Sequence, residues 1–239
     1  MLNSTAELVT FTNLEALQEH IVQCTRCPRL REYCLKIAAE KRRAYRDWNY
    51  WGLPLPSFGD PQARVLIIGL APAAHGGNRT GRMFTGDRSG DWLYRALYQT
   101  GFANQPQSVS RSDGLELHGA YVSAAIRCAP PGNKPLPQEI RNCRGYLNRE
   151  LDLLADLRGV VALGKIAFDT YLDLLKLRGL IPSRSAFTFG HDRQFTTAPG
   201  QPVLISSYHP SQQNTSTGKL TEKMLRAVFR RARRIAFGR

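Results

Sequence analysis

The sequence predicts a single α/β domain in which helices surround a parallel β-sheet. Four short apolar runs alternate with longer segments of helical periodicity, which is the pattern of consecutive β-α-β units. The chain has 239 residues, enough for one domain with a substantial core. Its 42% hydrophobic and 22% charged residues are ordinary for a globular protein. We therefore interpret residues 1–239 as one domain.

The expected strands are short and rich in Val, Leu and Ile, which is typical of buried parallel strands. They cover residues 63–68, 120–126, 160–163 and 203–207. The expected helices carry apolar residues at helical spacing and cover residues 13–23, 30–45, 92–100, 137–157, 166–177 and 220–237. Residues 187–197 alternate apolar and polar side chains about a glycine, which predicts a small hairpin with His191 in an exposed turn.

A glycine-rich segment, residues 69–87, follows the first expected strand directly and is interpreted as a binding loop. Its five glycines allow the backbone to approach a ligand closely, and polar side chains surround one aromatic residue, Phe84. Open α/β sheets bind ligands at the carboxyl ends of their strands. The segment has neither a Gly-Lys-Thr pairing nor a Gly-x-Gly-x-x-Gly pattern, which disfavours nucleotide hydrolysis and dinucleotide chemistry. The alternative is a flexible surface loop.

Two other expected strands also end in chemically distinctive loops. The second runs into Arg127 and a proline-containing loop that ends at Asn133. The fourth runs into His209 and Ser211, with Asn214 close behind. Because the carboxyl ends of parallel strands meet at one edge of the sheet, these loops and the glycine-rich segment are expected to form one crevice.

The charge balance indicates a polyanionic partner. Lys and Arg number 33 against 19 Asp and Glu, which gives a formal net charge of +14. Nucleic acid is the commonest polyanion, and the helical segments at both ends are expected to bind phosphates through Arg42, Arg43, Arg230, Arg231, Arg233 and Arg234. No apolar stretch approaches the ~20 residues of a membrane helix, and no signal segment is recognisable at the amino terminus. We therefore expect no membrane contact and a cytoplasmic, nucleoid-associated protein.

The five cysteines favour ligation over a disulfide framework, because an odd number in a cytoplasmic setting does not suit paired bridges. Cys24 and Cys27 form a CxxC, while Cys128 and Cys143 lie far along the chain. A zinc ribbon would show a second CxxC, so zinc is the second choice, and widely spaced cysteines suit an iron-sulfur cluster equally well. Four unrelated buried thiols are a third interpretation. Cys34 is expected to be a plain core residue.

Taken together, the motifs resemble the type 5 group of uracil-DNA glycosylases, within the uracil-DNA glycosylase superfamily. The resemblance rests on their order along nearly the whole chain: CxxC, Trp-Gly, Phe-Gly-Asp-Pro, Gly-Leu-Ala-Pro-Ala, Arg-Met-Phe-Thr-Gly-Asp, Arg-Cys-Ala-Pro-Pro-Gly-Asn-Lys-Pro and His-Pro-Ser. It implies a three-layer α/β/α sandwich on a four-stranded parallel sheet. It also implies a monomer that acts on DNA containing uracil or other deaminated bases. A structural 4Fe-4S cluster would be held by Cys24, Cys27, Cys128 and Cys143.

The resemblance also implies a base pocket. A glycosylase flips its target base out of the duplex and needs a stacking aromatic and a few hydrogen-bonding groups. Phe84 is the expected stacking residue, and His209 is expected to donate toward the O2 carbonyl of the departing base. Ser211 would meet the DNA backbone. The other expected substrate-binding residues are Gly69, Ala71, Ala73, His75 and Ser123.

Two positions depart from related groups. Leu70 stands where they carry a carboxylate or an amide, so the group that handles the attacking water must come from elsewhere. We predict Asp87 for that role, with Asn214 sharing it, and a helix cap is the alternative role of Asp87. Ser123 stands where related enzymes place an asparagine that pairs with uracil. A hydroxyl can donate or accept, which predicts a broader base range that includes hypoxanthine.

A function of another class also accounts for part of the sequence. A non-catalytic, metal-stabilised nucleic-acid-binding module would explain the positive charge and the cysteines. It would leave His209, Asn214 and the glycine-rich segment without a role.

Overall fold

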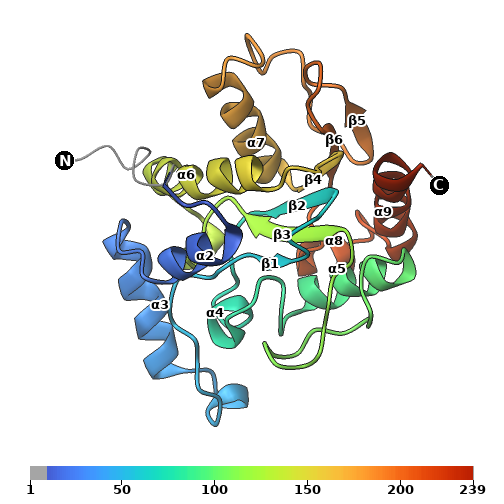
Figure 1. Cartoon of the computed structure of the whole chain (residues 1–239). Helices are drawn as coiled ribbons and strands as arrows, with labels where there is room; N and C mark the ends of the chain where they lie inside the picture. Colours follow the sequence, from blue (N-terminus) through green and yellow to red (C-terminus); the bar gives the residue numbers. More distant parts are fainter. Residues whose placement is uncertain (1–9, 239) are drawn as a thin grey trace.

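The computed structural model describes residues 10–238 and confirms the alternation of strands and helices (Figure 1). Residues 1–9, where the expected absence of a signal segment falls, lie outside the described residues. Within the described range the strands are β1 (Phe58–Gly59), β2 (Val65–Gly69), β3 (Ala120–Ala124), β4 (Gly159–Leu163), β5 (Arg193–Phe195) and β6 (Val203–Ser207). They form one sheet in the order β1-β3-β2-β4-β6-β5.

The expectation of a four-stranded, wholly parallel sheet is corrected, because this sheet has six strands and is mixed. The four expected strands, β2, β3, β4 and β6, do form and pair in parallel. The additional strands, β1 and β5, lie at the two edges and pair antiparallel with β3 and β6. They are two and three residues long, too short to leave a periodic pattern in the sequence.

The hairpin expected at residues 187–197 does not form either, since β5 pairs with β6 instead of with its own preceding segment. The alternation has another cause. Phe189 and Phe195 pack on Phe168 of the neighbouring helix, and Phe187 packs on Phe195, at ring-centroid distances of 5.5–5.8 Å. The apolar residues of this segment therefore cover a helix. His191 is half-buried instead of exposed, with its ring 5.2 Å from that of Tyr208.

The helices of the described residues are α2 (Leu14–Val22), α3 (Pro28–Glu40), α4 (Gly77–Thr80), α5 (Arg88–Gln99), α6 (Pro137–Leu153), α7 (Lys165–Leu177), α8 (Gln212–Ser216) and α9 (Glu222–Phe237), with 3-10 turns η1 (Arg43–Tyr45) and η2 (Pro131–Asn133). Six of the helices in the described residues match the expected segments with shifted ends, and the short helices α4 and α8 were not expected. The segment 30–45 breaks after Glu40 because Lys41 adopts a positive φ of 52°. None of these helices is long and apolar enough to cross a membrane.

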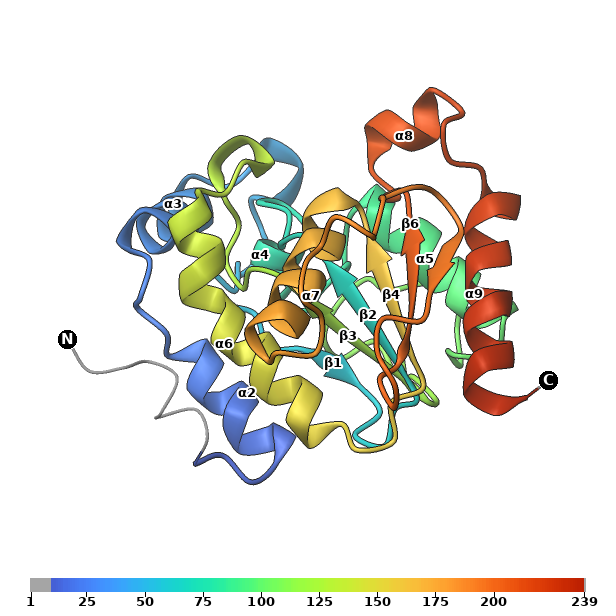
Figure 2. The same cartoon turned by 90° about the horizontal axis from the view of Figure 1, so that it is seen from above.

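Helices cover both faces of the sheet, so the chain has an α/β/α layering (Figure 1). α5 and α9 pack on one face, where Val65 and Ile67 of β2 enter the core. α6 and α7 lie on the other, which receives Leu66 and Ile68. The period-2 alternation of a strand explains this division between two cores. In the second view the parallel strands point toward the side where α8 lies (Figure 2). The carboxyl ends of β2, β3 and β6 therefore meet at one edge.

Candidate active site

The loops that follow β2, β3 and β6 enclose a cleft at the carboxyl edge of the sheet, as predicted. Its cavity has a volume of about 430 Å³. The residues around it come from all three loops and from the starts of α5 and α8: Leu70, Ala71, Ala73, Phe84, Asp87, Arg88, Ser89, Asn133, His209, Ser211 and Gln212. A neighbouring cavity of about 460 Å³ shares five lining residues with it: Ala73, Asp87, Arg88, Asn133 and Gln212. The two form one continuous depression.

Phe84 lies in this cleft in a constrained conformation. Its φ is +52°, a left-handed value that costs an ordinary residue free energy and is concentrated at functional sites. The ring lies directly over Gly69 at the end of β2, where a Cβ atom would come within 2.6 Å of Phe84 Cζ. Gly69 therefore contributes by its lack of a side chain. The ring is 5.7 Å from that of His209, with 28° between the planes.

Asp87 combines a structural contact with access to the cleft. Its Oδ1 accepts a hydrogen bond from the backbone N–H of Gly90 at 3.0 Å, so the residue caps α5, as the alternative interpretation expected. Its Oδ2 lies against the Cα of Gly76, where a Cβ atom would clash with it. Burial raises the pKa of the Asp87 carboxyl, although backbone N–H groups and Arg79 oppose that effect. The carboxylate is thus poorly solvated, next to the cavity that Phe84 and His209 line.

His209 follows β6 and is neutral at physiological pH, because burial lowers its pKa to about 4. Gly164 lies beside it, with the position of a Cβ atom 3.3 Å from His209 Cβ. Asn214 does not line the cavity. Its Nδ2 instead donates to the backbone carbonyl of His209 at 2.8 Å, from the short helix α8. Ser211 lines the cavity and caps α8, since its hydroxyl accepts from the N–H of Asn214. These contacts fix the turn that carries His209.

His75, Ala71 and Ala73 lie along the same depression, with Ala71 and Ala73 in the main cavity and His75 in the neighbouring one. The Nδ1 atom of His75 is hydrogen-bonded to the hydroxyl of Tyr50 at 3.0 Å. Burial lowers the pKa of His75, and Arg42 adds to this effect. The lowered pKa favours the neutral form of His75, which lies beside the cleft.

Ser123 lies apart from the cleft. It is fully buried in β3, and its hydroxyl is 2.7 Å from Glu150 Oε2 and 2.9 Å from Arg127 Nη2. Arg127 and Glu150 form an ion pair at 2.6 Å with exposed fractions of 1% and 0%, and Ser57 contacts both. Sequence alone placed Ser123 at the end of a strand, but its side chain is engaged by a buried polar network.

Asn133 and Gln212 line the cleft, although sequence reasoning did not select them. Asn133 ends the turn η2 with a φ of +57°, and Gln212 begins α8. Both side chains are amides, which can donate and accept hydrogen bonds at once. The available signal was the position of each amide in a loop that follows a parallel strand.

The four cysteines of the expected ligand set gather in one place. Cys24, Cys27, Cys128 and Cys143 belong to one apolar cluster, together with the fully buried Cys34. Three of the sulfur atoms face N–H groups: Cys143 receives the backbone N–H of the preceding loop at 3.3 Å, and Asn142 Nδ2 and Arg31 Nη1 lie 3.5 and 4.0 Å from Cys27 and Cys128. All are free thiols. Over residues 10–238, no three His, Cys, Asp or Glu side chains are placed to hold a metal ion.

The comparisons agree with the resemblance that the motifs indicated. A family model described as "Uracil DNA glycosylase superfamily" matches residues 56–233. The type-5 uracil-DNA glycosylase of Thermus thermophilus is 46% identical over 222 residues, which cover 93% of this chain and 98% of that protein. The type-5 enzyme of Mycobacterium tuberculosis is 49% identical over 215 residues, covering 89% and 78%. That of Pyrobaculum aerophilum is 46% identical over 212 residues, covering 89% and 88%. This chain therefore belongs to the uracil-DNA glycosylase superfamily.

Proposed function

We propose that the protein is a monofunctional DNA glycosylase that hydrolyses the N-glycosidic bond of deoxyuridine in DNA and leaves an abasic site for base excision repair. The observation that carries this proposal is the meeting of an aromatic ring, a half-buried carboxylate and a neutral imidazole in one cleft: Phe84, Asp87 and His209. The relatives named as type-5 uracil-DNA glycosylases support the same reaction. The net charge of +14 suits a DNA substrate.

The base leaves with the electrons of the broken bond, so negative charge builds on its O2 carbonyl. A neutral imidazole can donate a hydrogen bond to that oxygen without giving up its proton, and the lowered pKa of His209 keeps it in this form. Rings that face each other across an inserted base would have to be about 7 Å apart, twice the usual carbon–carbon contact. At 5.7 Å, Phe84 and His209 leave no such gap. The base therefore stacks on the open part of the Phe84 ring with its edge toward His209.

The deoxyribose becomes positively charged as the base departs, and this charge is where Asp87 acts. A poorly solvated carboxylate stabilises a nearby cation more strongly than an exposed one, and it can orient the water that adds to C1′. Water supplies the hydroxyl group of the product, and its proton balances the departing base anion. Asn214 acts through the backbone of His209, which it holds by its amide, and so is a positioning residue in this scheme.

We further propose that the base range includes hypoxanthine. The support for this base range comes from the residues that line the cleft. Ser123 gives none, because its hydroxyl is already hydrogen-bonded to Glu150 and Arg127. The side-chain amides of Asn133 and Gln212 are the candidates for recognising the base. An amide can both donate and accept, so it can pair with the lactam N–H and C=O of uracil or of hypoxanthine. The continuous depression has room beyond a single pyrimidine ring. Replacing Asn133 with Ala should change the ratio of uracil to hypoxanthine excision, whereas Ser123→Ala should leave it unchanged.

We also propose that Cys24, Cys27, Cys128 and Cys143 hold a 4Fe-4S cluster with a structural role. The donor set fits this group, because each iron takes one thiolate and the sulfur atoms surround the cluster instead of meeting at one ion. The N–H groups directed at three of the sulfur atoms suit thiolates. Protein purified without oxygen should be brown and contain iron. Cys34→Ser should keep the colour and Cys143→Ser should lose it, while a colourless protein with stoichiometric zinc would contradict the proposal.

The decisive experiment for the function is an abasic-site assay on a duplex with a single uracil. We expect strand breaks after alkali treatment with the parent protein, at a rate that His209→Ala lowers strongly. Undamaged duplex is the control. A protein that binds the duplex tightly but makes no abasic site would instead support the non-catalytic binding module. We also propose that the protein acts as a monomer, which sedimentation with DNA can test.

A further inference from the structure

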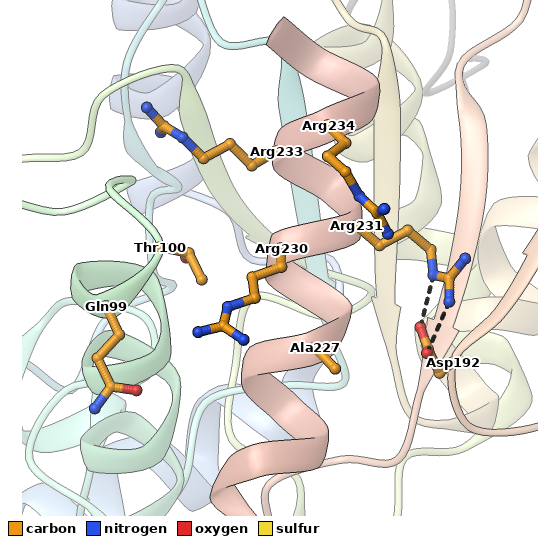
Figure 3. A pocket seen from close by; sticks show the side chains of 8 residues that line it. All are labelled: Gln99, Thr100, Asp192, Ala227, Arg230, Arg231, Arg233 and Arg234. Carbon is orange, nitrogen blue, oxygen red and sulfur yellow. Dashed lines mark hydrogen bonds and ion pairs between the residues drawn. The ribbon is translucent and has the colours of Figure 1, made fainter. Parts of the chain in front are cut away.

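A second concave surface lies on the flank of the molecule along α9, with α5 on one side and Asp192, beside β5, on the other (Figure 3). Its cavity has a volume of about 640 Å³, and Gln99, Thr100, Asp192, Ala227, Arg230, Arg231, Arg233 and Arg234 line it (Figure 3). We call it the α5–α9 groove. It shares no lining residue with the candidate active site. α9 ends beside Arg64, which precedes β2, so the arginines lie toward the amino edge of the sheet. The candidate active site is at the carboxyl edge.

Two of the four arginines form the fixed walls of the groove. Arg231 donates both guanidinium arms to the Asp192 carboxylate, at 2.9 and 3.0 Å. Arg233 donates to the carbonyl of Gly101 at 2.9 Å, and its guanidinium lies over an aromatic ring at 5.2 Å. These contacts hold both side chains in place before any ligand arrives, and Figure 3 shows the contact of Arg231 with Asp192.

The other two arginines, Arg230 and Arg234, are exposed and have no carboxylate within ion-pair distance in the part of the chain that the structure describes. They are four residues apart on neighbouring turns of α9, and their side chains diverge, Arg230 toward Gln99 and Arg234 toward Arg231 (Figure 3). Like charges at this spacing repel each other, and phosphates bound beside them relieve the repulsion. The lining residues carry four guanidinium groups and a single carboxylate, Asp192. The groove therefore has uncompensated positive charge.

The ligand chemistry follows from this arrangement. A guanidinium group presents planar N–H donors that match phosphate oxygens, and Gln99 and Thr100 add neutral hydrogen-bonding groups at the rim. Repeated cations along a helix match a repeated anion better than a single one. A nucleic-acid strand carries one phosphate per 3.4 Å of helix axis, and Arg230 and Arg234 are separated by about 6 Å along α9, so both can reach phosphates of one strand.

We propose that the α5–α9 groove is a second DNA-binding site, which holds the phosphates of an undamaged segment while the cleft is free to examine another. This inference rests on the proposed function only for the identity of the polyanion. The groove faces a different side of the molecule from the cleft, so its contribution is to affinity for DNA and to retention on it. It takes no part in breaking the glycosidic bond.

The test is the double variant Arg230→Gln/Arg234→Gln, which keeps helix-forming side chains and removes two charges. The matched control, Arg158→Gln/Lys176→Gln, removes two charges from exposed positions that do not line the groove. Affinity for an undamaged duplex is measured across a salt series. Loss of two phosphate contacts should flatten the slope of log K against log salt by about 1.8 and weaken binding at low salt by roughly tenfold. The control should keep the parental slope.

Excision at saturating enzyme separates this inference from the proposed function. The groove variant should cut a uracil-containing duplex at the parental single-turnover rate, and only the enzyme concentration needed for saturation should rise. If the parent excises no uracil but the slope still falls, the DNA-binding groove stands without the glycosylase. Equal losses in both double variants would show a general charge effect and overturn the proposal. Unchanged DNA binding with a lost affinity for polyglutamate would also overturn it, in favour of an acidic protein partner.

Discussion

Replacing Asp87 with Asn separates the two roles that the structure gives this side chain. An asparagine caps a helix about as well as an aspartate, so the hydrogen bond to the Gly90 N–H is retained. The substitution removes only the charge. Loss of a positioned acid-base group typically costs roughly 10²–10⁴-fold in the chemical step, which is about 2.7–5.5 kcal/mol of activation free energy. We expect Asp87→Asn to excise uracil more slowly by that factor.

The stability of the same variant should change little or rise. A charge at the first turn of a helix contributes about 0.3–1 kcal/mol through the helix dipole, and Asn loses this contribution. Against that, burial raises the pKa of Asp87 above its unfolded value, so ionising it at neutral pH costs folding free energy that Asn does not incur. The folded state binds the extra proton, hence this cost grows as pH rises through the raised pKa. A slow enzyme with an unchanged or higher melting temperature is the expected signature.

The assay is single-turnover excision at saturating enzyme, measured beside thermal melting for three variants. Asp87→Ala loses both the helix cap and the charge. Its free energy of unfolding should fall by about 1 kcal/mol, so it should melt at a lower temperature, and it should also excise uracil slowly. Asp91→Asn is the matched control, because Asp91 is an exposed acidic residue in the same first turn of α5 that does not line the cleft. It should cut at the parental rate. Parental excision by Asp87→Asn would refute the reasoning and leave Asp87 as a cap alone.

Three further predictions follow from neighbouring contacts. Gly69→Ala places a Cβ atom 2.6 Å from the Phe84 ring, so excision should fall at least tenfold, and a parental rate would show that this ring position is not needed. Because burial lowers the pKa of His209 to about 4, its protonation should not reduce the excision rate between pH 8 and 5.5. The unfolded chain takes up this proton first, so stability should fall as pH drops from about 6.5 toward 4. An acid limb near 6.5 that disappears in His209→Gln would contradict this. Glu150→Gln leaves the buried Arg127 unpaired and should cost about 3–5 kcal/mol in urea unfolding, where a loss under 1 kcal/mol would contradict the pairing.

The sequence was informative where a local pattern repeats over several residues. The four parallel strands were predictable because each is a run of apolar residues bounded by turns. The long helices were predictable because their apolar spacing continues over three or more turns. The edge strands were not, since two or three residues cannot carry a period. The apolar–polar alternation of residues 187–197 resembled that of a hairpin, but its cause is the packing of the phenylalanines on α7 and on one another.

The candidate site also has features that the sequence predicted and features that it did not. The sequence by itself determined that the loops after β2, β3 and β6 share one edge, because strand direction in a parallel sheet fixes where each strand ends. The sequence therefore already predicted that Phe84, Asp87 and His209 lie in one crevice. Only the tertiary structure decided which way each side chain points. Ser123 lies in β3 and Asn133 in the loop that follows it, yet Ser123 contacts a buried ion pair and Asn133 lines the cleft. Side-chain direction and burial arise from packing between distant segments, which no local pattern records.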